Sequence, residues 1–74
     1  MRSEQVQAFI DVTEHGYFAA AARHTGVKRS TLSAAVNALE DSLGVALFER
    51  SGNSLTLTAV GDSVLPDCYR LLTS

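Results

Sequence analysis

The chain has 74 residues, one cysteine and a formal net charge of −2, from six Lys and Arg against eight Asp and Glu. This length allows one small domain, and a single cysteine excludes an internal disulfide framework. The longest apolar run, residues 17–22, is too short to cross a membrane, and residues 1–5 lack the apolar stretch of a signal peptide. A cytoplasmic location is therefore expected.

Charge is distributed unevenly along the chain. Between His15 and Leu39 there are three basic residues and no acidic one, which gives this segment +3 and leaves −5 for the rest of a chain whose net charge is −2. Such a segment can orient one face of the protein toward phosphates. The overall acidity, which is unusual for a DNA-binding domain, predicts weak non-specific binding to DNA.

The first predicted helix begins at Ser3 or Glu4 and ends at Glu14, before Gly16. Ser3 is a plausible N-cap, and glycine commonly follows the last turn of a helix. Four residues recur at helical spacing and should form the buried face: Val6, Phe9, Ile10 and Thr13.

A second helix is predicted from Phe18 to His24 or Thr25, followed by a tight turn at Gly26. Residues 19–22 are all alanine, which favours helix and lets a neighbouring helix approach closely. Two short helices joined by a turn that contains glycine are typical of a helix-turn-helix, whose second helix enters the DNA major groove. Here the motif would cover about residues 18–43.

The third predicted helix spans about residues 29–43 and ends before Gly44, with Ser30 as a candidate N-cap. Its core face should carry Leu32, Val36, Leu39 and Leu43. The opposite face has short polar and small side chains, which allow a helix to lie deep in a groove: Arg29, Ser30, Ser33, Ala34, Asn37 and Ala38.

A β-hairpin is predicted over residues 45–57, with Phe48, Leu55 and Leu57 facing the core and residues 51–54 forming the turn. Thr58 should cap a last helix over about residues 59–72, which Pro66 should kink or locally open. The order predicts a mainly α fold: a winged helix-turn-helix over residues 1–58, with its wing over about residues 46–57, followed by a linker or dimerisation helix over residues 59–74.

These residues resemble the N-terminal domain of LysR-type transcriptional regulators. The resemblance rests on spaced motifs across nearly the whole chain: Gly16-x-Phe18-x-x-Ala21-Ala22, Leu32-Ser33, Leu39-Glu40, Leu43-Gly44-Val45-x-Leu47-Phe48-Glu49-Arg50 and Leu57-Thr58-x-x-Gly61. The Leu-Gly-x-x-Leu-Phe-x-Arg segment favours this family over winged helices similar to molybdate regulators. The resemblance implies a dimer that binds operator DNA, with a small-molecule effector bound by a C-terminal domain absent from these 74 residues.

Three segments depart from the usual pattern of the family. Lys28-Arg29-Ser30 stands in place of Ser-Gln-Pro, Ala34-Ala35 stands in place of Arg-Gln, and the wing continues as Ser51-Gly52-Asn53-Ser54 instead of an arginine-rich sequence. Positive charge has therefore moved from the middle of the third helix to its start.

The predicted DNA contacts begin at the start of the third helix. Arg29 is the first candidate for recognition of a base, because arginine commonly binds guanine O6 and N7; its alternative is a phosphate contact or a solvated charge. Lys28 should contact phosphate, or else stay solvated. The hydroxyls of Ser30, Thr31 and Ser33 can bind phosphates or base edges, although Ser30 could equally cap the helix.

The remaining contacts come from the helix middle, the wing and the start of the second helix. Ala34 offers only apolar contact to a thymine methyl group, and Asn37 is either a base or phosphate contact or simply an exposed polar residue. Arg50 is a phosphate or minor-groove candidate, or forms an ion pair with Glu40, Asp41 or Glu49. Asn53 either touches the DNA backbone or only forms the turn. Tyr17 either contacts a phosphate or packs partly against the protein.

No catalytic, metal or cofactor site is predicted. His15 and His24 have no cysteine or carboxylate at ligand spacing and should be surface or helix-end residues. Cys68 could face a dimer seam or solvent. The last helix should expose apolar residues to a partner copy, because one small core cannot cover them all: Val60, Val64, Leu65 and Leu71.

Sequence-specific binding of double-stranded DNA by a transcription regulator is the favoured function. Dimer symmetry would then imply a pseudo-palindromic operator. The alternative is a winged-helix protein-interaction and dimerisation module with weak DNA affinity, which the acidic balance and the wing composition suggest. An enzyme is not expected, since no acid-base pair or cofactor motif is apparent.

Overall fold

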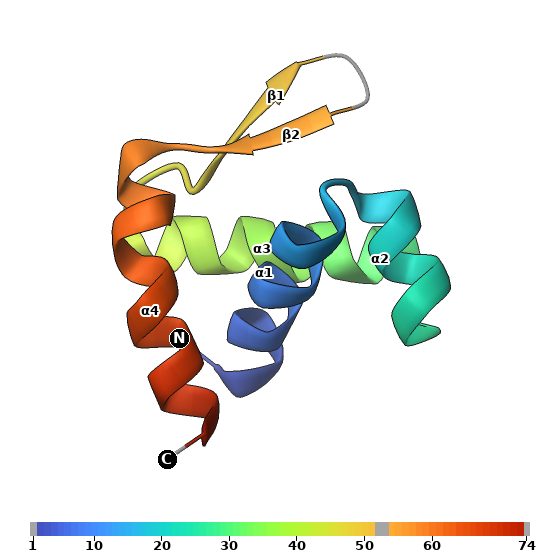
Figure 1. Cartoon of the computed structure of the whole chain (residues 1–74), viewed down its shortest axis with the longest axis horizontal. Coiled ribbons are helices and arrows are strands. Elements are labelled where there is room, and N and C mark those ends of the chain that lie inside the picture. Colours follow the sequence, from blue (N-terminus) through green and yellow to red (C-terminus); the bar gives the residue numbers. More distant parts are fainter. Residues whose placement is uncertain (1, 52–53, 74) are drawn as a thin grey trace.

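The computed structural model describes residues 2–51 and 54–73. Figure 1 shows α1, α2 and α3 packed together, the hairpin projecting from them, and α4 running beside α1. The predicted winged helix-turn-helix is confirmed. The elements of the described residues are α1 (Ser3–His15), α2 (Phe18–Thr25), α3 (Arg29–Leu43), β1 (Phe48–Ser51), β2 (Ser54–Leu57) and α4 (Ala59–Thr73).

Glycines end the first three helices, as the sequence predicted. Gly16, Gly26 and Gly44 are all left-handed, with φ of 82°, 77° and 72°. The amide of each donates to a carbonyl of the last turn, as Gly26 does to Ala22 at 2.9 Å. Side chains rarely tolerate this backbone conformation, so these glycines fix the helix ends and the turn of the helix-turn-helix.

Two predicted helix caps are wrong. The N-cap of α1 is Arg2 instead of Ser3, and the N-cap of α3 is Lys28 instead of Ser30. An N-cap has extended backbone, and Arg2 (ψ 154°) and Lys28 (ψ 142°) are the residues that have it. The serines lie inside the first turns, and at α1 the Gln5 side-chain oxygen accepts the Arg2 amide at 3.2 Å.

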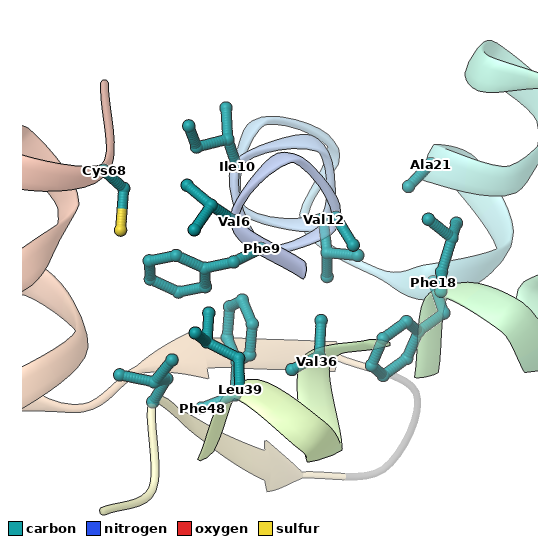
Figure 2. Packing of buried hydrophobic residues seen from close by; sticks show 13 residues of the cluster. Val6, Phe9, Ile10, Val12, Phe18, Ala21, Val36, Leu39, Phe48 and Cys68 are labelled. Atoms are coloured by element: carbon teal, nitrogen blue, oxygen red, sulfur yellow. The ribbon is translucent and has the colours of Figure 1, made fainter. Parts of the chain in front are cut away.

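The core lies between α1, α3 and the first strand of the wing. Phe9 of α1 meets Phe48 of β1 edge to face, with ring centroids 5.3 Å apart (Figure 2). Val36 and Leu39 of α3 are fully buried beside them, whereas Leu43 keeps 40% of its surface exposed. The prediction of Leu43 as a core residue is wrong, because it occupies the last turn of α3, where the chain departs toward the wing.

The last helix, α4, packs one face on α1. Cys68 is buried on the side of α1 that carries Val6 and Phe9 (Figure 2), so the prediction that it faces a seam or solvent is wrong. Val64 and Leu65 are partly buried against the core, whereas Val60 and Leu71 are 41% and 54% exposed. The helix is continuous through Pro66, so the predicted local opening there is wrong, and a kink stays a prediction.

Polar contacts fix the base of the hairpin. The Thr58 hydroxyl donates to the Ala46 carbonyl at 2.7 Å and accepts the Gly61 amide at 3.0 Å, so it caps α4 as predicted. The Leu55 amide donates to the carbonyl of Gly16 at 3.3 Å. In the antiparallel register Phe48 pairs with Leu57 and Arg50 with Leu55. The wing is therefore attached to α4 and to the turn between α1 and α2.

Candidate nucleic-acid interface

One face of α3 is buried and the opposite face is open, as predicted. Leu32, Val36 and Leu39 point into the core. Ser33 and Ala38, both predicted on the open face, are only half-buried. The exposed residues at the start and on the outer face of α3 are Arg29, Ser30, Thr31, Ala34 and Asn37. This outer face presents hydroxyl, amide, methyl and guanidinium groups, which are the chemical types that recognise base edges and phosphates.

The start of α3 is electropositive for two reasons that act together. Lys28 at the N-cap and Arg29 at the first helical position are both exposed, and the first turn contains no acidic residue. The helix dipole places additional partial positive charge at the same end. Backbone amides of the first turn also lack intrahelical partners and suit an anion such as a phosphate.

A groove of about 420 Å³ separates the start of α2, the side of α3 and the wing. Two cations, Arg29 and Arg50, lie on its walls. The structure therefore brings together candidates that are distant in the sequence. The groove is lined by Tyr17, Phe18, Ala19, Arg29, Ser33, Arg50, Ser54 and Leu55.

Arg50 connects the wing to α3. Its Nη2 atom donates to the side-chain oxygen of Asn37 at 3.0 Å, and its guanidinium carbon lies 5.5 Å from the centre of the Phe18 ring. Within residues 2–51 and 54–73, Arg50 forms no ion pair with Glu40, Asp41 or Glu49. The ion-pair alternative for Arg50 is therefore wrong, and its charge stays available to a phosphate.

Tyr17 occupies the N-cap of α2 and is 42% exposed. Its hydroxyl oxygen accepts from the guanidinium of Arg23 at 3.4 Å. A hydroxyl that accepts from a cation keeps its own proton to donate, so the pair can present both a donor and a positive charge to a phosphate.

Three residues of this region have roles that the sequence did not indicate. Phe18 supplies the ring beneath Arg50, and Arg23 supports the hydroxyl of Tyr17. Glu40 has a carboxylate that binds backbone amides at the start of the wing. The only available signal was the presence of Phe18 and Glu40 in the family motifs, which does not specify their partners.

Other candidates lie apart from the groove or outside the description. The groove is not lined by Lys28, Ser30, Thr31, Ala34 or Asn37, which are exposed at the start and on the outer face of α3, and Asn53 falls outside the described residues. The rings of His15 and His24 are 4.4 Å apart and tilted by 39°. In the described part of the chain, no cluster of three metal-ligating side chains occurs, and none of the helices is long and apolar enough to span a membrane.

Comparison with known proteins decides the family. Residues 3–62 match the sequence profile described as bacterial regulatory helix-turn-helix protein, lysR family. The chain belongs to the LysR family. This LysR-family chain is 48% identical over 71 residues to a probable nitrogen assimilation transcriptional activator of Synechococcus elongatus, a match that covers 96% of the chain and 23% of that protein.

A second relative is ClcR of Pseudomonas putida, an HTH-type transcriptional regulator, which is 42% identical over 97% of the chain and 24% of its own length. The LysR-family chain thus spans about a quarter of the length of these curated relatives.

Solved structures of LysR-family regulators have the same fold. The DNA-binding domain of CbnR in a complex with DNA is 42% identical, with a TM-score of 0.93, and the match covers 97% of the chain and 83% of that domain. Oxidised OxyR of Corynebacterium glutamicum is 34% identical, with a TM-score of 0.91, over 96% of the chain and 22% of OxyR.

Proposed function

We propose that this LysR-family chain binds double-stranded DNA with sequence specificity as part of a transcription regulator. The observation that carries the proposal is the open face of α3 beside a groove with Arg29 and Arg50 on its walls. In this arrangement α3 enters the major groove, and the wing lies on the phosphate backbone or in the minor groove. The likeness to a CbnR domain crystallised with DNA supports DNA as the partner.

The proposed contacts divide into those that position the protein and those that recognise sequence. Arg29 binds a guanine edge, and Ala34 packs against a thymine methyl group. Lys28, Arg50 and Tyr17 contact phosphates. The remaining contacts come from the Asn37 amide, from Asn53 of the wing and from three hydroxyls of α3. These hydroxyls belong to Ser30, Thr31 and Ser33.

The chain is further proposed to act as a homodimer through α4. Val60 and Leu71 expose apolar surface on this helix, whereas Val64 and Leu65 contribute less because the core already covers part of them. A two-fold dimer requires a pseudo-palindromic operator, with half-sites separated by about one helical turn or a multiple of it. Effector binding would belong to a region outside these 74 residues, and the bacterial cytoplasm, where the chromosome lies, would be the site of action.

Net charge favours a second candidate function. A chain with a charge of −2 binds non-specific DNA weakly, as a winged helix that serves only for protein interaction would. Against this candidate, Lys28 and Arg29 stand together at the start of α3, and Arg29 and Arg50 line the groove, where a phosphate backbone would lie.

Selection from a pool of random duplex DNA tests the proposal. The expected result is enrichment of one half-site, repeated with two-fold symmetry at a fixed spacing. Loss of all enrichment, with the protein folded by circular dichroism, would support the interaction module instead. A variant with Arg29 and Arg50 both replaced by Ala serves as the negative control.

A further inference from the structure

We propose that Arg50 determines which base Asn37 recognises, so that Asn37 selects guanine over adenine. This inference rests on the proposed DNA binding and refines it at one base pair. Asn37 belongs to the outer face of α3, and Arg50 belongs to the wing, so the preference would depend on contact between the two DNA-binding elements.

The geometry restrains both side chains. Arg50 lies on β1 opposite Leu55, and its guanidinium is held between the ring of Phe18, 5.5 Å from the ring centre, and the amide of Asn37, 3.0 Å away. An aromatic face attracts a guanidinium. Arg50 is therefore a positioning residue with two partners, one from α2 and one from α3.

Chemistry fixes the direction in which the amide of Asn37 faces. A guanidinium has five N–H donors and no acceptor. Only the oxygen of the Asn37 amide can bind it, so the NH₂ group must point away from Arg50. Asn37 can therefore offer DNA two N–H donors. Its remaining acceptor is the second lone pair of the oxygen that already binds Arg50.

This orientation changes the base that fits. An unrestrained asparagine binds adenine through one donor and one acceptor, at N7 and N6. Guanine presents two acceptors, O6 and N7, at the same edge. An amide oxygen that already accepts from Arg50 is a weaker acceptor for the N6 amino group of adenine, whereas the two N–H donors of the same amide match the two acceptors of the guanine edge.

The test uses the duplex enriched by selection and begins with Asn37→Ala. The base pair at which this variant no longer distinguishes the bases is the one that Asn37 contacts. At that position the unmodified protein should bind guanine about 5- to 150-fold more tightly than adenine, the range for a good bidentate contact. Replacing that guanine with 7-deazaguanine, which lacks the N7 acceptor, should also weaken binding.

Two matched variants of Arg50 separate its role as a positioning residue from its charge. Arg50→Met removes the donors and the charge. It should abolish or reverse the preference for guanine, and it should lower the affinity for both the duplex with guanine and the duplex with adenine at that position. Arg50→Lys keeps a group that only donates, and it should retain the preference for guanine. The readout is the ratio of the two affinities, which loss of a phosphate contact alone does not change. In the Asn37→Ala background, Arg50→Met should leave the ratio unchanged.

Three results would overturn the inference. Asn37→Ala could flatten no position, the flattened position could favour a base other than guanine, or Arg50→Met could leave the ratio unaltered. Each of these requires an enriched duplex that binds. Failure to enrich any duplex would instead contradict the proposed function.

Discussion

The carboxylate of Glu40 on α3 accepts a hydrogen bond from the backbone amide of Leu47 at 2.7 Å. The same oxygen accepts the amide of Phe48 at 3.2 Å, where β1 begins. These bonds fasten the wing to the helix that is proposed to enter the major groove. Because Leu47 and Phe48 are buried, water cannot easily replace the carboxylate, and the wing and α3 keep one relative orientation.

Removal of this carboxylate should destabilise the fold. Glu40→Ala leaves two amides of the wing without an acceptor, and we expect a loss of about 1.5–3 kcal/mol in the free energy of unfolding, the range for hydrogen bonds to charged groups. Glu40→Gln keeps an oxygen for Leu47 and should lose less. Urea unfolding followed by circular dichroism measures both. Glu49→Ala, on the exposed side of β1, is the control and should change stability little.

Gly61→Ala should destabilise the protein, although alanine ordinarily favours a helix by up to about 1 kcal/mol over glycine. A Cβ atom at position 61 would lie 2.3 Å from the carbonyl oxygen of Leu47, so α4 would have to move away from the wing. Overpacking of this kind costs about 1–3 kcal/mol. Ser63→Ala, on an exposed site of the same helix, is the matched control and should be neutral or slightly stabilising. Equal effects of the two substitutions would show that α4 does not pack closely on Leu47.

Neighbouring cations at the start of α3 should differ in their effect on DNA binding. Arg29→Ala should relax the preference at one base pair, with a loss of about 1–3 kcal/mol on the preferred base. Lys28→Ala should weaken binding to all sequences alike and reduce the magnitude of the salt slope by about one per protomer. Affinities for a set of duplexes with single base changes distinguish the two. A uniform loss for Arg29→Ala would make it a phosphate contact.

The Cys68 thiol should be unreactive in the folded protein. Burial raises its pKa above the ordinary value of a thiol, so the fraction of reactive thiolate at pH 8 is reduced. The folded state holds this proton more tightly than the unfolded state, so the protein is more stable while the thiol is protonated. This contribution to the free energy of unfolding is fully present below the ordinary thiol pKa, and it is lost as the pH rises through the raised pKa of the folded state. Iodoacetamide at pH 8 should label Cys68 only when denaturant is added. Rapid labelling without denaturant would contradict its burial against α1.

Substitutions on α4 should separate the proposed dimer contact from the core. Leu71→Glu places a charge at a residue that is 54% exposed, and it should weaken dimerisation in analytical ultracentrifugation while leaving the circular dichroism spectrum unchanged. Leu65→Glu places the charge against the core and should lower the free energy of unfolding. If the unsubstituted chain is strictly monomeric at high concentration, α4 does not mediate dimerisation of these 74 residues.

The sequence predicted element boundaries well where local chemistry determines them. Gly26 and Gly44 end helices because their backbone conformation excludes most other residues, and the Thr58 cap needs only the side-chain hydroxyl of Thr58 and the backbone amide of Gly61. Ser3 and Ser30 were predicted as caps on side-chain type alone. The residues with extended backbone immediately before α1 and α3 are Arg2 and Lys28, and these are therefore the N-caps.

Features that depend on packing between distant segments could not be predicted. The helical spacing of Leu43 matches the core face, yet no spacing shows where the neighbouring elements stop covering α3. Arg50 had three acidic candidates nearby in sequence, but the fold places Asn37 and Phe18 beside it instead. The candidate residues of the interface were therefore identifiable from sequence, whereas the contacts that orient them were not.

The most direct test of the central claim is the affinity for the selected duplex and for a scrambled duplex at several salt concentrations. We predict preference for the selected duplex by about a thousandfold or more. With about 3–4 phosphate contacts per protomer, log affinity of the dimer should fall against log salt with a slope of roughly −5 to −7. Equal affinity for the two duplexes, or a slope near zero for both, would contradict sequence-specific DNA binding by this chain.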